Sequence, residues 1–114
     1  MKLTEPDLKI KCKASHLNTL LEYLREIIEN HNEYLETFIH NSTVRRIYRH
    51  NLSTLCEKVA KCVFNYININ PNGKEISLKL NYAERITLSS VVDHYPLPME
   101  INFIEYEIKN KLII

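Results

Sequence analysis

The chain has 114 residues, of which 45% are hydrophobic and 25% charged, and its formal net charge is +1. This length and composition indicate one globular domain, residues 1–114, with a single hydrophobic core. A charge so close to neutral gives no overall field that would attract nucleic acid or an acidic membrane. No apolar run approaches the roughly 20 residues that a membrane-spanning helix needs, so no membrane partner is expected.

The first seven residues include no apolar segment of the kind that a secretory signal requires. The cysteine count is odd, and the spacing of Cys12, Cys56 and Cys62 argues against a disulfide framework. We therefore expect a cytoplasmic protein whose thiols are reduced.

Residues 8–13 alternate between apolar side chains and lysines, which predicts a half-buried strand. Ser15 is the candidate N-cap of the helix that follows. From residue 16 onward apolar side chains recur every three or four positions as far as Phe38. This spacing predicts one helix that ends at about residue 40.

The residues His40, Asn41 and Ser42 form the predicted turn, with Asn41 or Ser42 as the next N-cap. A second apolar stripe begins at Val44 and predicts a helix that ends at about Asn65. Because so short a connection makes neighbouring helices antiparallel, we expect a long helical hairpin.

Residues 68–74 contain Pro71 and the pair Asn72-Gly73 and are predicted to form a loop. Residues 76–80 alternate and predict a second strand. Asn81 followed by Glu84 resembles a capping box at the start of a third helix. That helix is expected to bury Tyr82, Ile86, Val91, Val92 and Tyr95.

A Pro-Leu-Pro sequence at residues 96–98 ends the third helix, and Pro98 suits the first turn of a fourth. The fourth helix is expected to bury Ile101, Ile104, Ile108 and Leu112, and its apolar end at residues 112–114 needs a covering partner. The order strand–helix–helix–strand–helix–helix predicts an α+β domain that is predominantly helical, with the long antiparallel helical hairpin and a small two-stranded sheet.

Residues 7–67 and 75–114 match weakly at an offset of 68 residues. The matched pairs are Leu8 with Ile76, Ile10 with Leu78, Cys12 with Leu80, Leu20 with Leu88, Tyr23 with Val91, and Leu24 with Val92. Two interpretations stay open: an internal repeat, or the similarity that any two amphipathic strand–helix units share by chance.

Motifs for catalysis and metal binding are missing from the sequence. One glycine in the whole chain excludes glycine-rich phosphate loops, and no CxxC, HExxH or paired ExxH pattern occurs. The pair Asp93-His94 has no nucleophile that can be placed beside it, and Cys56 and Cys62 fall on different helix faces. We expect no catalytic residue, no metal and no cofactor, and interpret the chain as a non-enzymatic protein.

The two predicted hairpin helices differ in charge, with net −4 over residues 15–40 and net +4 over residues 41–65. The acidic side chains form one stripe, composed of Glu22, Glu26, Glu29, Glu33 and Glu36. This stripe either pairs with the basic helix or contacts a partner protein. Exposed ion pairs contribute only about 0–1 kcal/mol each. Such pairing would therefore influence which helices pack together more than it would raise the stability of the fold.

Two basic groups are candidate contacts for nucleic acid or a partner. The first, Arg45, Arg46 and Arg49, lies at the start of the second helix, where cations oppose the helix dipole. The second is formed by Lys9, Lys11, Lys13 and Lys79, which share one surface if the strands pair. Lysines on exposed strands also protect a sheet edge from aggregation, so both interpretations stay open.

These patterns favour an interaction or accessory domain that self-associates, with another copy or another protein as partner. The alternative is a nucleic-acid-binding accessory protein that uses the basic helix start and the lysine-lined strands.

Overall fold

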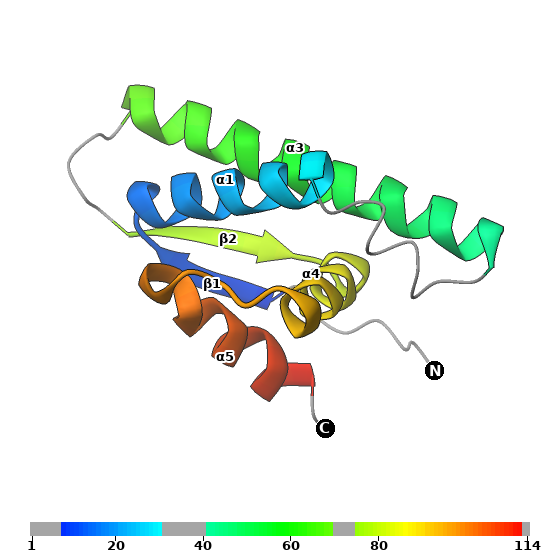
Figure 1. The fold of residues 1–114 in the computed structure, drawn as a ribbon. Coiled ribbons are helices and arrows are strands. Elements are labelled where there is room, and N and C mark those ends of the chain that lie inside the picture. The colour runs from blue at the N-terminus through cyan, green and yellow to red at the C-terminus, as the bar shows by residue number, and fades with distance from the viewer. Residues whose placement is uncertain (1–7, 31–40, 70–74, 113–114) are drawn as a thin grey trace, which may run out of the picture.

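The computed structural model describes residues 8–30, 41–69 and 75–112. Its elements are β1 (Leu8–Cys12), α1 (Ala14–Asn30), α3 (Ser42–Ile69), β2 (Ile76–Leu80), α4 (Tyr82–His94), the 3-10 turn η1 (Met99–Ile101) and α5 (Asn102–Leu112). Figure 1 shows two paired strands packed against helices, which confirms the predicted α+β class and its predominantly helical character.

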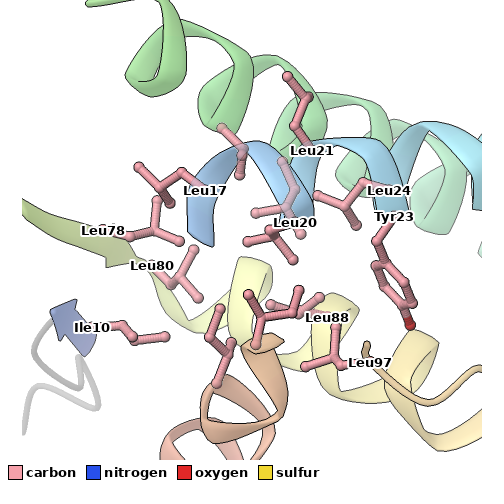
Figure 2. Packing of buried hydrophobic residues seen from close by; sticks show 14 of the residues in the cluster. Ile10, Leu17, Leu20, Leu21, Tyr23, Leu24, Leu78, Leu80, Leu88 and Leu97 are labelled. Carbon is pink, nitrogen blue, oxygen red and sulfur yellow. The ribbon is translucent and has the colours of Figure 1, made fainter. Parts of the chain in front are cut away.

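The strands β1 and β2 pair antiparallel, with Ile10 opposite Leu78 at the centre of the register. Along each strand, buried and exposed side chains alternate. In Figure 2, Leu78 and Leu80 point from β2 toward the leucines of α1, and Ile10 points from β1 into the same cluster. The sheet therefore buries one face against the helices and exposes the other.

The helices α1 and α3 lie side by side and run in opposite directions (Figure 1), as the predicted hairpin requires. The part of the first predicted helix after Asn30, and the connection to α3, lie outside the described residues. Asn41 is the N-cap of α3, because its Oδ1 accepts hydrogen bonds from the backbone N–H groups of Thr43 (2.9 Å) and Val44 (3.1 Å). The helix continues to Ile69, beyond the end predicted near residue 65.

The prediction that Ser15 caps the first helix is wrong. α1 begins at Ala14, and Lys13 precedes it as the cap residue. The carbonyl of Lys13 accepts from the backbone N–H of Leu17 (3.1 Å), and the Lys13 N–H donates to Nδ1 of His16 (3.1 Å). The imidazole of His16 thus accepts a hydrogen bond from the backbone N–H of the cap residue. In a capping box, a glutamate at the same position of the helix accepts this hydrogen bond.

The capping box predicted at the start of α4 is confirmed. The backbone N–H of Glu84 donates to Oδ1 of Asn81, and the backbone N–H of Asn81 donates to Oε1 of Glu84, both at 2.8 Å. Each partner satisfies a donor that the first turn of a helix would otherwise leave open.

The prediction that Tyr82 and Ile86 are buried is wrong, since these side chains are 54% and 41% exposed. The predicted burial of Val91 and Val92 is confirmed, and the buried face of α4 also carries Glu84, Arg85, Thr87 and Leu88. The apolar pattern predicted the wrong face for the first turns of α4, because the face that is buried carries polar side chains there. Burial is tolerated there since Glu84 is hydrogen-bonded. Tyr95 is half-buried.

One hydrophobic core receives side chains from both strands and from every helix described here (Figure 2). Ile101, Ile104 and Ile108 are buried in it, as predicted for the fourth helix. The Tyr23 hydroxyl donates to the Tyr95 carbonyl and ties α1 to the segment after α4. The apolar C-terminus at residues 113–114 lies outside the described residues.

The strand and first helix of the two halves correspond at the offset of 68 residues. The bounds of β2 are those of β1 shifted by 68, and α4 begins 68 residues after α1. Ile10 and Leu78, which correspond at this offset, also face each other across the strands. An approximate two-fold axis between these two residues would therefore exchange the strands.

The correspondence extends to the helix starts. His16 and Glu84 each accept a hydrogen bond from the N–H of the residue that precedes their helix. Thr19 and Thr87 each donate their hydroxyl to the carbonyl four residues earlier. All six pairs matched in sequence are buried on both sides. The second helices of the two halves, α3 and α5, do not share the offset, so a repeat of the whole halves stays a prediction.

A candidate docking groove between α3 and α4

A hollow with a volume of about 260 Å³ lies between the first half of α3 and the outer side of α4. It is lined by Val44, Ile47, Tyr48 and Asn51 from α3, and by Tyr82, Ala83, Ile86, Thr87 and Ser90 from α4. None of these side chains is charged. We call this hollow the α3–α4 groove.

Exposed apolar side chains concentrate in this groove. Among the described residues seven large hydrophobic side chains are exposed, and four of them line it: Val44 (49%), Ile47 (55%), Tyr82 (54%) and Ile86 (41%). Single exposed apolar residues are common on protein surfaces, whereas a group of them in one concave site is typical of an interaction surface.

The corresponding positions of the first half carry no large apolar side chains. At the offset of 68 residues, Tyr82 corresponds to Ala14 and Ile86 to Asn18. Asn18 lies on an exposed part of α1, where a polar residue is the ordinary choice. The apolar side chains of α4 therefore need a reason other than the packing of this strand–helix unit.

A smaller polar hollow of about 90 Å³ continues the groove toward the start of α4. It is lined by His50, Asn51, Thr54, Asn81, Ala83 and Glu84, and it shares Asn51 and Ala83 with the groove. Nearby, Nζ of Lys58 lies 2.8 Å from Oε1 of Glu84 and joins α3 to α4. The groove therefore has an apolar length and one polar end.

Tyr48 stands between the groove and the core. Its ring lines the groove, whereas its hydroxyl is buried and has no hydrogen-bond partner among the described residues. Burial raises the pKa of Tyr48 to about 12. The phenol consequently stays neutral at physiological pH and adds no charge to the groove.

The predicted arginine group lies on the first turns of α3, with Arg45 half-buried and Arg46 and Arg49 exposed. None of the three lines the groove. With about 3.6 residues per turn, Arg45 and Arg49 share a side of α3 that differs from the groove side. Their predicted role as partner contacts stays a prediction.

The acidic stripe is described only in part. Glu22, Glu26 and Glu29 are exposed on α1, whereas Glu33 and Glu36 lie outside the described residues. Where the structure describes both helices, no salt bridge joins the first three glutamates to α3. The described part of the acidic stripe therefore does not support the interpretation that opposite charges pair the two helices. The other interpretation, that the stripe contacts a partner protein, stays a prediction.

Strand pairing brings Lys9, Lys11 and Lys79 onto the exposed face of the sheet, and Lys9 lies directly opposite Lys79. Lys13 is also exposed but follows the end of β1. Three of the four predicted lysines thus share one surface.

The candidate reactive side chains of the sequence lie outside the two hollows. Asp93 is exposed and accepts a hydrogen bond from Lys109 (2.6 Å), which raises the pKa of that lysine. Neither hollow is lined by Asp93, His94 or Cys62. In the described parts of the chain, no three His, Cys, Asp or Glu side chains gather in a way that could hold a metal ion.

The three cysteines are free. Burial is the main cause that raises the pKa of each thiol, to about 11 for Cys12. For Cys56, the neighbouring Arg25 partly opposes this rise. These thiols are therefore weak nucleophiles at neutral pH.

Among the residues described, no helix combines the length and the apolar character needed to cross a membrane. Comparisons of the chain with protein-family models, with curated proteins and with solved structures found no match.

Proposed function

We propose that this chain is a non-enzymatic interaction domain that associates with a second copy of itself through the α3–α4 groove. One observation carries the proposal: four exposed apolar side chains from two helices line a single concave site. Burial of such side chains against a partner removes apolar surface from water, which is the main driving force of association.

A second copy suits this groove because its lining is uncharged. In a two-fold symmetric contact a residue near the axis meets its own copy, so a charge there would face a like charge. The two hydroxyl side chains, Thr87 and Ser90, and the amide of Asn51 can each donate and accept hydrogen bonds. They can therefore pair with their counterparts in the other copy.

The expected affinity is modest. Full burial of an isoleucine contributes about 1.5–3 kcal/mol, and about half of the Ile47 and Ile86 surface is already buried within one chain. Association itself costs several kcal/mol. These magnitudes favour a dimer that forms at micromolar or higher concentrations rather than an obligate one.

Sedimentation velocity across a dilution series tests the proposal. The wild-type chain should shift from dimer to monomer on dilution, and a variant with Ile47→Asp and Ile86→Asp should remain monomeric throughout. The control variant carries Met99→Asp and Tyr106→Asp, which alter side chains that are 86% and 70% exposed outside the groove. It should dimerise like the wild type.

Two results would contradict the proposal. A wild-type chain that stays monomeric at millimolar concentration has no such interface. Equal loss of the dimer in the groove variant and the control variant would place the interface elsewhere.

A further inference from the structure

Three lysines gather on the exposed face of the two-stranded sheet, on the side opposite to the core. Lys9 and Lys79 face each other across the strands, and Lys11 follows Lys9 on the same face. None of the three takes part in a salt bridge with any residue that the structure describes. We call Lys9, Lys11 and Lys79 the lysine face.

Protection of the sheet edge favours charged side chains, lysine in particular, but it does not account for the like-charge pair of Lys9 and Lys79. The exposed positions of the two strands are Lys9, Lys11, Ser77 and Lys79, whereas the chain as a whole has 15 cationic and 14 acidic residues. A carboxylate at any of these positions would also discourage edge-to-edge pairing. Opposite Lys9, it would in addition replace a like-charge pair by an attractive one. The four exposed strand positions carry three cations and no acid, although Glu75 directly precedes β2, and the like-charge pair Lys9–Lys79 requires a further reason.

The spacing keeps the three charges within reach of one ligand. Directly opposed residues have Cβ atoms about 5 Å apart, which applies to Lys9 and Lys79. Two residues along a strand span about 7 Å, which applies to Lys9 and Lys11. An anion with several phosphate groups, close to one another, would neutralise all three ammonium groups and relieve their mutual repulsion.

We propose that the lysine face binds the phosphate backbone of double-stranded nucleic acid without reading its sequence. A two-stranded ribbon has the dimensions to approach a duplex, and a duplex carries about one negative charge per 1.7 Å of its axis. The exposed strand positions offer no aromatic side chain on which unpaired bases could stack. Stacking is a main source of affinity for single strands, so the duplex is the favoured form.

This site is separate from the α3–α4 groove and does not depend on self-association. If two copies do associate, two lysine faces on one duplex would increase the apparent affinity through multivalency.

Fluorescence anisotropy with a labelled duplex of random sequence tests the proposal at low salt. With three phosphate contacts, the dissociation constant should rise on the order of 40-fold between 50 and 200 mM salt. Lys79→Gln should weaken binding several-fold and reduce the salt slope by about one. The triple variant Lys9→Gln, Lys11→Gln and Lys79→Gln should abolish binding.

Matched controls separate the lysine face from charge in general. Lys61→Gln removes one exposed cation of α3, and Arg46→Gln removes one from the arginine group; both should bind like the wild type. Circular dichroism should show that all variants remain folded, because every substituted side chain is solvent-exposed.

Four outcomes would overturn the proposal. The first is that the duplex does not bind at 50 mM salt. The second is that Lys61→Gln weakens binding as much as Lys79→Gln does, and the third is that only Arg46→Gln weakens binding. The fourth is that a single strand of the same length binds more tightly than the duplex. A parallel titration with phosphatidylserine vesicles gives a fifth: lysine-dependent binding of vesicles without binding of the duplex would assign this face to a lipid surface instead.

Discussion

Grafting the residues of α1 onto the corresponding positions of α4 gives the sharpest test of the α3–α4 groove. The double variant Tyr82→Ala and Ile86→Asn places on α4 the side chains that α1 has at Ala14 and Asn18. If the apolar residues serve a partner, the variant should lose self-association and remain folded.

The magnitudes follow from the exposed fractions. Tyr82 and Ile86 are 54% and 41% exposed, so about half of their apolar burial exists within one chain. Losing that part costs about 1.5–3 kcal/mol of the free energy of unfolding, and the better helix propensity of alanine recovers about 0.5 kcal/mol of it. Complete burial of the remaining exposed surface in both copies would contribute roughly 3–6 kcal/mol per dimer, which is a factor of at least about 100 in the dissociation constant.

Urea denaturation at a concentration where the chain is monomeric measures the first quantity, and sedimentation equilibrium measures the second. A loss of unfolding free energy above about 4 kcal/mol, the range of core truncations, would refute the reasoning, because Tyr82 and Ile86 would then act as core residues. An unchanged dissociation constant would refute it as well.

Further predictions concern the core and the helix caps. Urea denaturation should show that Glu84→Ala lowers the free energy of unfolding by about 2 kcal/mol, since Asn81 and Lys58 each lose an acceptor at 2.8 Å. Glu84→Gln retains an acceptor and should lower this free energy by less than about 1 kcal/mol. Leu88→Ala, at a fully buried position, should cost about 3–5 kcal/mol. Burial raises the pKa of Cys12 from 9.0 to about 11, so the folded chain keeps this proton after the unfolded chain has lost it. Stability should therefore fall as the pH rises from about 9 to about 11, and Cys12→Ala should make this fall shallower.

Local signals in the sequence were sufficient for most of the elements. Strict alternation predicted both strands because a period of two is incompatible with a helix face. Asn41 and the pair Asn81–Glu84 predicted two helix starts, since their side chains satisfy backbone donors a few residues away. Each of these interactions joins residues at most three positions apart, so the sequence alone contains the necessary information.

The candidate site depends on interactions between distant parts of the chain. Tyr82 and Ile86 fit an apolar stripe, and the sequence does not show that Glu84 would bond Lys58, 26 residues earlier, and bury a polar stripe instead. A comparison of the halves at the offset of 68 residues offers a signal that could have identified the site. It matches Tyr82 with Ala14 and Ile86 with Asn18, a small side chain that is partly buried and a polar one that is exposed.

The same comparison explains why the groove stays open within one chain. His16 and Glu84 occupy corresponding positions, yet they contact different kinds of partner. The ring of His16 packs edge-on against Phe103 of α5, with centroids 5.1 Å apart. Glu84 instead bonds Lys58 of α3 at 2.8 Å.

Because a largely buried carboxylate must keep its donors, the Lys58–Glu84 ion pair favours one position of α4 along α3. In that position Tyr82 and Ile86 remain partly exposed, so their apolar surface is available for a partner to cover.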